Sequence, residues 1–290
     1  MNKIKYCLMI LVVMVMFKNV FAQTGDLRIH RVTGTITRFA LTDIISLDFS
    51  DENTVRIIHT YPYSASPYYL ATTEFDSITF CKIEGSVTDI EGKIYRTVKI
   101  NNDWWMAENL NTIHYKTGNI AASEIPEVTV ADTWENYPNG AYCNYDNVAS
   151  NASTFGRLYN WNAVNTGNLA PEGWHVSTRA EWDALDSYIG VSDGLKLKSD
   201  DTPTEDNWTD VNVSNDGGGD DTYGFTALPG GRRSGNNGLF SSLHDYAFFW
   251  TSDNANSSST WYYQMSYSNN NLTNSTYVKD SGYSVRCVRD

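Results

Sequence analysis

A run of carboxylates between Ser199 and Gly224 is the first group of residues whose chemistry suggests a site. The stretch SDDTPTEDNWTDVNVSNDGGGDDTYG shows neither helical nor strand periodicity, so we expect a long irregular loop. Carboxylate oxygens are the hard donors that calcium prefers, and the candidate calcium ligands are Asp216, Asp220 and Asp221. The spacing is not that of an EF-hand, and a solvated acidic loop is the alternative interpretation.

Aromatic and amide side chains in the last third of the chain form a second candidate site. Tyr and Trp rings can lie flat against sugar rings while neighbouring Asn and Ser side chains bond the hydroxyls. The candidate ligand-binding residues are Trp261, Tyr262, Tyr263, Tyr267 and Asn270. Because successive strand residues face opposite sides of a sheet, Tyr262 is out of phase with Trp261 and Tyr263. Burial of one of these two sets in the core is therefore the alternative.

Arg232 completes the set of candidate ligand-binding residues. It follows Gly230 and Gly231 and precedes Arg233. Paired arginines beside flexible glycines can clamp a carboxylate or a phosphate. A structural ion pair that holds the loop is the simpler interpretation of Arg232. The glycine pair has no Walker lysine after it, so it does not indicate a phosphate loop.

The sequence offers no constellation of residues for catalysis. No two of the five histidines have metal-ligand spacing, and no nucleophile elbow or Cys/His arrangement occurs. His175, in GWHVST, is expected to be a buried, hydrogen-bonded residue rather than a general base. We therefore expect that the protein is not an enzyme. A hydrolase with an opposed pair of carboxylates is the less favoured alternative.

The first residues of the chain are typical of an export signal. Lys3 and Lys5 precede an apolar run from Cys7 to Phe17, and Val20-Phe21-Ala22 has the small-residue pattern of a cleavage site. We expect residues 1–22 to be a signal peptide that is cleaved after Ala22. The mature protein would be extracellular or at the cell surface, with the periplasm as the alternative. No later segment is long and apolar enough to span a membrane.

The charge of the mature chain excludes one class of partner. The full chain carries a formal charge of −13, and removal of three signal lysines would change this to about −16. So acidic a protein repels a phosphate backbone, and no basic stripe offsets the repulsion. Nucleic acid is therefore not expected as a partner.

Three cysteines would remain after processing, namely Cys81, Cys143 and Cys287. In an oxidising compartment an odd number allows at most one bridge. We predict a bridge between Cys143 and Cys287, because both lie in the larger domain and a long-range bridge would fix the final strand. A pairing that involves Cys81 stays open.

Two parts of unequal size follow the signal. Residues 23–81 contain a degenerate repeat of short β-rich segments, LRIH with IISLDF and then VRIIH with DSITF, and so small a unit is marginal alone. Residues 82–290 open with a hairpin that turns at Glu91-Gly92, followed by the strand WWMAENL. A T-x-x-E capping box predicts a helix from Thr178 to Gly190, and a second helix is expected from Gly156 to Val164. After the acidic loop come antiparallel strands that end at Arg289.

Several of these segments resemble a known family. They are GRLYNWNAV, GWHVSTRAEWDAL, FTALPGGRRSGNNGLF, FFWTS and GYSVRCVRD, in this order along the chain. They resemble the Fibrobacter succinogenes major paralogous domain, a secreted bacterial module that is distantly similar to C-type-lectin-like and formylglycine-generating-enzyme-like folds. The resemblance implies an α+β, C-type-lectin-like domain with antiparallel strands, two helices and long irregular loops. The small N-terminal β-rich unit, ending in DSITF, resembles a segment found in exported proteins of the Bacteroidota.

The resemblance implies no common activity. Formylglycine-generating enzymes depend on a closely spaced cysteine pair that binds copper, whereas Cys287 stands alone near the end of this sequence. The predicted function is therefore non-catalytic binding or adhesion, with polysaccharide as the leading ligand class and another surface protein as the second. A structural or protein-interaction module of the cell envelope is the alternative.

Overall fold

The computed structural model describes residues 85–116, 123–190, 192–199, 208–209 and 219–290, together with the backbone of the strands between residues 25 and 82. The chain divides into two compact units, Met1–Glu84 and Gly85–Asp290.

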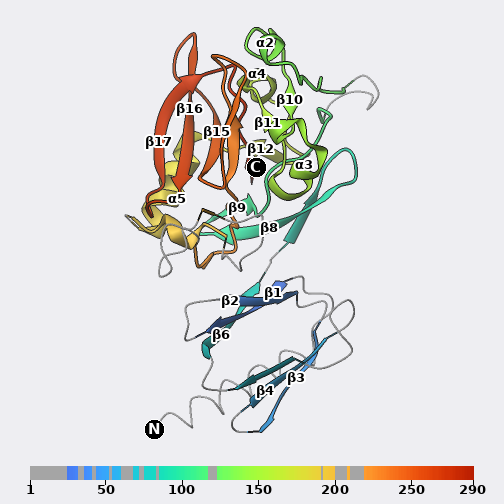
Figure 1. The fold of residues 1–290 in the computed structure, drawn as a ribbon, viewed down its shortest axis with the longest axis vertical. Helices are drawn as coiled ribbons and strands as arrows, with labels where there is room; N and C mark the ends of the chain where they lie inside the picture. The colour runs from blue at the N-terminus through green and yellow to red at the C-terminus, as the bar shows by residue number, and fades with distance from the viewer. Residues whose placement is uncertain are drawn as a thin grey trace. The chain divides into compact units, whose positions relative to one another are not determined.

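The first unit contains two antiparallel three-stranded sheets (Figure 1). In one sheet β1 (Gly25–Arg31) lies between β2 (Ile36–Ala40) and β6 (Phe75–Lys82). In the other sheet, β4 (Thr54–His59) lies between β3 (Ile44–Asp51) and β5 (Tyr68–Ala71). The LRIH segment belongs to β1, IISLDF belongs to β3 and DSITF belongs to β6.

The first sheet of the second unit is antiparallel throughout and brings the two ends of this unit together. Its strands, in order across the sheet, are β12 (Trp174–Val176), β18 (Cys287–Arg289), β9 (Asp103–Met106), β8 (Ile94–Ile100) and β7 (Gly85–Thr88). The predicted hairpin is confirmed, since β7 and β8 pair and Gly92 adopts a φ of 82° in the turn. The Asp89 carboxylate closes this turn by accepting 2.9 Å hydrogen bonds from the backbone N–H groups of Glu91 and Lys93.

The second sheet of this unit also has five strands. In order they are β14 (Phe240–Leu243), β13 (Gly230–Arg233), β15 (Tyr246–Asn254), β16 (Ser259–Ser266) and β17 (Thr273–Val278). All neighbours are antiparallel except β13 and β15, which meet in one parallel bridge. A further small sheet pairs β10 (Tyr142–Cys143) with β11 (Leu158–Tyr159). With its helices, the unit has a mixed α+β architecture of mainly antiparallel sheets.

The predicted helix at Thr178 is confirmed as α5 (Arg179–Ile189). The Thr178 hydroxyl accepts from the backbone N–H of Glu181 at 3.2 Å, and the Glu181 carboxylate accepts from the backbone N–H of Thr178 at 2.7 Å. The helix ends at Gly190, whose φ is 101°. The other helical elements are short, and they are α2 (Ala131–Trp134), η3 (Tyr145–Asn147), α3 (Ala149–Phe155), α4 (Trp161–Val164) and η4 (Gly194–Lys196).

The predicted helix from Gly156 to Val164 is wrong over most of its length. Gly156 has a φ of 74° and ends α3, and the next residues form β11. Only Trp161–Val164 is helical, and the Asn160 side chain caps it by accepting from the backbone N–H of Ala163 at 3.1 Å. The buried stripe of this segment therefore comes from a strand and one helical turn rather than from one helix.

Trp182 fastens α5 to the second sheet. Its ring stacks on Tyr263 at 5.2 Å between centroids and on Phe249 at 5.2 Å, while Trp105 of the first sheet meets its edge at 4.9 Å. Aromatic pairs of this kind add about 0.5–1.5 kcal/mol beyond the burial of their area. The helix therefore lies in a core that both sheets share. Within the described part of the chain no helix is long and apolar enough to cross a membrane.

Candidate functional site

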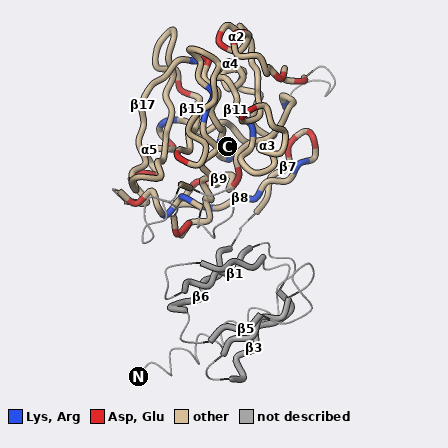
Figure 2. The backbone as a smooth tube through the Cα atoms, in the orientation of Figure 1, with Lys and Arg blue, Asp and Glu red and all other residues tan. Residues whose placement is uncertain are grey.

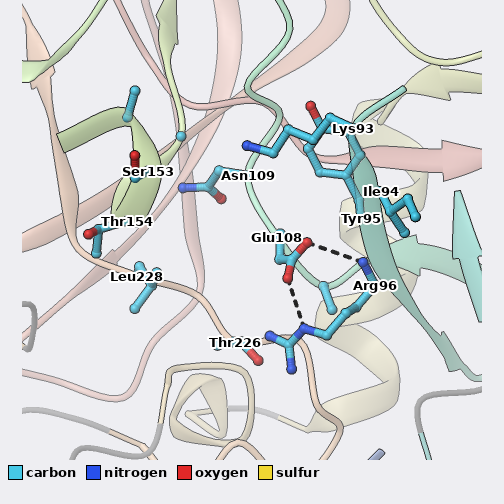
Figure 3. Close-up of a pocket in the computed structure, with 13 residues that line it drawn as sticks. Lys93, Ile94, Tyr95, Arg96, Glu108, Asn109, Ser153, Thr154, Thr226 and Leu228 are labelled. Carbon is cyan, nitrogen blue, oxygen red and sulfur yellow. Dashed lines mark hydrogen bonds and ion pairs between the residues drawn. The ribbon is translucent and has the colours of Figure 1, made fainter. Parts of the chain in front are cut away.

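A pocket of about 330 Å³ opens beside β8 in the second unit (Figure 3). Its walls come from β8, from the segment that follows β9, from α3 and from the residues after Gly224. The residues with polar side chains that line it are Lys93, Tyr95, Arg96, Glu108, Asn109, Ser153, Thr154 and Thr226. A volume of this size falls in the range of about 300–1,000 Å³ that is usual for small-molecule sites.

An ion pair crosses one wall of the pocket. Nε of Arg96 lies 2.9 Å from Oε1 of Glu108, and the backbone N–H of Arg96 donates to Oε2 at 3.2 Å (Figure 3). Both side chains keep about a third of their surface exposed, at 33% and 37%. The carboxylate is therefore neutralised and oriented by one residue, but it can still accept a hydrogen bond from a ligand.

Asn109 forms the floor of the pocket and is held on both ends of its amide. Its Nδ2 donates to the carbonyl of Phe155 at 2.7 Å and to the hydroxyl of Ser284 at 3.3 Å. Its Oδ1 accepts a 2.6 Å hydrogen bond from Nε of Arg286. These bonds fix which end of the amide faces which partner.

Arg286 lies fully buried behind Asn109. Its terminal nitrogens donate to the backbone carbonyls of Met106 at 2.9 Å, Phe225 at 2.6 Å and Thr226 at 2.8 Å. Its guanidinium also lies 4.5 Å from the centroid of the Phe225 ring. Burial lowers the pKa of this guanidinium, but the surrounding carbonyl dipoles favour the charged form, which is the usual state of arginine. Arg286 thus connects two walls of the pocket, because it binds Met106 at the end of β9 and also Phe225 and Thr226.

Thr226 sits at the rim in a conformation that a β-branched residue rarely adopts, with a φ of 52°. The buried carboxylate of Asp221 holds it there, accepting from the Thr226 backbone N–H at 2.7 Å and from the Thr226 hydroxyl at 2.8 Å. Backbone strain of this kind costs about 1–3 kcal/mol and persists only where the surrounding structure fixes it. The hydrogen bonds to Asp221 therefore stabilise the Thr226 conformation that forms this part of the pocket.

Gly156 allows α3 to approach Asn109. A Cβ atom at this position would lie 2.6 Å from Cβ of Asn109 and 2.9 Å from the carbonyl oxygen of Leu110. A side chain would therefore separate the α3 wall from the floor. The positive φ of Gly156 is a second reason for glycine at this position.

Lys93 lies at the opposite side of the pocket from Ser153 and Thr154 (Figure 3). Its Nζ is 5.3 Å from the centroid of the Tyr95 ring, and burial lowers the pKa of the ammonium group. Figure 2 shows acidic and basic positions side by side on the β7–β8 hairpin that carries Lys93. The pocket thus presents an ammonium group, a paired carboxylate and hydroxyls, which suit a polar ligand that both donates and accepts hydrogen bonds.

The aromatic residues singled out in the sequence do not form one exposed platform. Tyr262 and Tyr263 are buried, at 8% and 1% exposure, on opposite faces of the second sheet. Tyr263 stacks on Trp182, and its hydroxyl donates to the Asp183 carboxylate. Trp261 is half-buried, with the guanidinium of Arg179 3.8 Å from its ring centroid. Packing is therefore the main role of these strand residues.

The remaining two members of that set lie near the β16–β17 turn. Tyr267 is half-buried against the core that contains Trp182. Asn270 is exposed, and its carbonyl accepts a 2.7 Å hydrogen bond from the backbone N–H of Gly194. Neither residue lines the pocket.

Arg232 and Arg233 have different roles. Arg232 is half-buried between the rings of Phe248 and Tyr277, at 5.3 and 5.4 Å, and its Nε donates to the hydroxyl of Ser241 at 3.3 Å. Arg233 is fully buried and donates to the carbonyls of Gly238, Val128 and Thr129. The loop is therefore held by Arg233 through backbone carbonyls, and the structural ion pair expected at Arg232 is replaced by contacts with aromatic rings.

The three candidate calcium ligands are not brought together at one site among the described residues. Asp216 lies outside the described residues. One carboxylate oxygen of Asp220 accepts from the backbone N–H and hydroxyl of Thr222, at 3.0 and 2.5 Å, and Asp221 is engaged with Thr226. Among the residues that the structure describes, no three acidic, histidine or cysteine side chains converge as a metal site would require.

The predicted bridge between Cys143 and Cys287 is not formed, and both cysteines are free and buried. They belong to different clusters of the core. Cys143 lies with Trp134 and Leu158, whereas Cys287 lies with Trp174 and its neighbours. Burial raises the pKa of the Cys143 thiol to about 12 and raises that of Cys287 further. The side chain of Cys81 lies outside the described residues.

His175 is a hydrogen-bonded residue, as the sequence suggested, but it is half-buried rather than buried. Its Nε2 lies 2.8 Å from Oε1 of Glu181, and its Nδ1 lies 2.7 Å from Oδ1 of Asp290. The two carboxylates, Glu181 first, raise the pKa of His175 to about 9. The ring therefore links α5 to the end of the last strand.

The pocket residues were not singled out from the sequence. One signal was present, because Arg286 lies between Val285 and Cys287 in an apolar segment directly before β18, where a charged residue must find buried partners. The partners, however, come from segments far away in the chain. Lys93, Arg96 and Glu108 have no distinguishing sequence pattern.

Comparison with known proteins gives one match. Residues 98–289 match the Fibrobacter succinogenes major domain, a span that includes Glu108, Asn109 and Arg286. No curated protein and no solved structure matches the chain. The matched span covers most of the second unit and about two thirds of the whole chain. The chain belongs to the Fibrobacter succinogenes major domain family.

Proposed function

We propose that this protein is an exported, non-catalytic binding or adhesion protein, and that its ligand is a polysaccharide bound in the pocket beside β8. The observation that carries the proposal is the lining of the pocket. Saccharide hydroxyls donate and accept hydrogen bonds, and the lining offers both kinds of partner in Glu108, Ser153 and Thr154. The mixed α+β architecture with mainly antiparallel sheets is compatible with a C-type-lectin-like fold, which we propose for this unit and which commonly serves binding.

The rigid support of the pocket favours binding. Asn109 and Arg286 are fixed by hydrogen bonds to several different chain segments. A site whose walls are held in place before the ligand arrives loses less conformational entropy on binding. A pocket of this construction is therefore suited to hold a sugar unit of a longer polymer at its open side.

The test is retention of the purified protein on an array of plant, host and bacterial polysaccharides, once with calcium and once with a chelator. Ser153→Trp places a large ring at the pocket, because Ser153 is exposed on α3 and lines it. Ser150→Trp is the matched control, since Ser150 is exposed on the same helix outside the lining. We expect calcium-independent retention that Ser153→Trp abolishes and Ser150→Trp preserves.

Two results would count against this site. Retention that survives Ser153→Trp would place the saccharide elsewhere, and retention that disappears with the chelator would point to the acidic residues between Ser199 and Gly219. Absence of retention on every polysaccharide would overturn the saccharide proposal.

A protein partner is the second candidate, and an exposed apolar patch favours it. Val130, Val148 and Leu239 are 59%, 46% and 60% exposed. They lie close together around the start of α2, because a Cβ atom at Gly238 would lie 2.5 Å from Cα of Ala131, and Nδ2 of Asn147 donates to the Thr129 carbonyl. Scattered apolar residues are normal on a surface, whereas a contiguous group indicates an interaction site.

The protein-partner candidate is tested with the double variant Val130→Asp and Leu239→Asp. Envelope proteins retained by the wild type should be lost by this variant and kept by Tyr188→Asp, which alters an exposed aromatic residue on α5. Equal retention by all three proteins would exclude the patch.

Export itself has a direct test. The proposed cleavage after Ala22 predicts that the protein isolated from its source begins at Gln23. Intact-mass measurement decides this, because a protein that retains residues 1–22 would be heavier by the mass of that segment.

A further inference from the structure

We infer that the pocket selects an acidic saccharide, and that the ammonium group of Lys93 binds the carboxylate of a uronic acid unit. This inference rests on the proposed function, because it names the ligand class of the same pocket. It is carried by the position of Lys93 and by the state of every carboxylate around it.

Lys93 reaches into the pocket without a hydrogen-bonding partner among the described residues. Its side chain extends along the Tyr95 ring, with Nζ 5.3 Å from the ring centroid, and Figure 3 shows the amine directed toward the space above Asn109. A half-buried ammonium group has lost part of its hydration, and an anion from the ligand would compensate for that loss.

The carboxylate within the pocket is already paired. Glu108 binds Arg96 through a 2.9 Å side-chain contact and a 3.2 Å bond from the backbone N–H. Three charged residues line the pocket, namely Lys93, Arg96 and Glu108. The opposite charges of Arg96 and Glu108 neutralise each other, so the positive charge of Lys93 has no counterpart in the lining. Counted over its lining residues alone, the pocket therefore carries one positive charge, on a chain whose formal charge is −13.

The nearest carboxylates outside the pocket are engaged as well. Asp89 accepts from two backbone N–H groups of its own turn and from the Tyr95 hydroxyl at 2.7 Å. Glu91 accepts from the Thr112 hydroxyl at 3.0 Å and the Ile113 backbone N–H at 2.6 Å. It also contacts the His114 ring at 2.8 Å. Both carboxylates act on Lys93 through their charge, but the hydrogen bonds that they accept come from other groups.

The opposite wall supplies what the rest of a sugar ring needs. Ser153 and Thr154 carry hydroxyls on α3, across the pocket from Lys93, and Glu108 lies between the two walls (Figure 3). A uronic acid unit has a carboxylate at one end and hydroxyls around the ring, so it matches an ammonium group on one wall and hydroxyls on the other. A neutral hexose would leave Lys93 without its partner.

The experiment compares matched ligands that differ at one carbon. Binding of galacturonate and glucuronate oligomers is measured by calorimetry beside galactose and glucose oligomers of equal length, at low and at raised salt. We expect the wild type to prefer the uronates by about tenfold or more, and salt to reduce this preference. Lys93→Gln should remove the preference by weakening the binding of the uronates. Lys99→Gln is the control, because Lys99 is exposed on β8 outside the pocket.

The outcomes separate this inference from the proposed function. Equal or stronger binding of the neutral oligomers would overturn the role of Lys93 and leave saccharide binding in place. An unchanged uronate preference in Lys93→Gln, or an equal loss in Lys99→Gln, would also overturn it. Absence of binding to every oligomer in the set would overturn this inference, whereas the proposed function is overturned only when the polysaccharide array also shows no retention.

Discussion

Oδ1 of Asn109 accepts a 2.6 Å hydrogen bond from Nε of Arg286, and this contact joins the floor of the pocket to the last strand region of the chain. The two residues are 177 positions apart. Asn109 is 7% exposed and Arg286 is 0% exposed, so the bond lies in the interior. The shape of the pocket therefore depends on the correct docking of the end of the domain against its beginning.

The first prediction concerns Arg286→Met. The substitution preserves much of the volume but leaves Oδ1 of Asn109 and three backbone carbonyls without their donor. A buried acceptor without a partner costs about 1–3 kcal/mol, so we expect the free energy of unfolding to fall by at least about 3 kcal/mol. Urea unfolding measures the change. Arg289→Met, at an exposed position of β18, should alter it by less than about 0.5 kcal/mol.

The contribution of Arg286 shows where sequence reasoning succeeds and where it stops. Local signals predicted local structure, since the capping box at Thr178 and Glu181 located α5, and Gly92 located the first hairpin turn. Such signals depend on residues that are close together in the chain, so the sequence alone is enough to recognise them. The partners of Arg286 are brought together only by the tertiary fold, so no local pattern announces them.

The same limit explains why the ion pair expected at Arg232 does not occur and why Arg233 holds the loop instead. Sequence places Arg232 and Arg233 side by side, and strand geometry sends their side chains to opposite faces. Which face is buried depends on the elements that cover it, here Trp134 and Phe240 over Arg233 at 4.6 and 4.8 Å. The aromatic strand residues failed as a surface platform for this reason too, because helix α5 covers one face of β16.

The second prediction concerns the close approach of α3. Gly156→Ala should destabilise the domain more than Gly167→Ala does, although both glycines have a positive φ, 74° and 67°. A Cβ at Gly167 meets nothing within 4 Å, whereas one at Gly156 would lie 2.6 Å from Asn109. At Gly156 the positive φ is combined with a ψ of −172°, a conformation that essentially only glycine adopts and that alone costs alanine about 1–3 kcal/mol. The clash should add about 1–3 kcal/mol at Gly156. If thermal or urea unfolding shows that both variants lose the same stability, the α3 wall can shift to accommodate the added Cβ atom.

The third prediction concerns the two buried thiols. Cys143 and Cys287 should resist alkylation in the native protein, because both are buried and burial raises the pKa of each thiol. After unfolding without a reductant, both should react. Peptide mapping by mass spectrometry reads each site separately. A linked peptide that joins Cys143 to Cys287, or rapid labelling of either in the native state, would contradict the structure.

The fourth prediction is a pH-dependent loss of stability that requires His175. Since Glu181 and Asp290 raise its folded pKa to about 9, above the usual value of 6.5, the stabilisation is complete below pH 6.5 and is lost as the pH rises through 9. The ring is 36% exposed, so solvent screening limits the effect to about 1 kcal/mol. The pKa of Glu181 is lowered, so its own contribution is lost only as the pH falls into the acid range. Urea unfolding at several pH values should therefore separate the wild type from His175→Gln at pH 6 and bring the two together near pH 10. Parallel curves over this range would mean that the ring makes no charged link between α5 and Asp290.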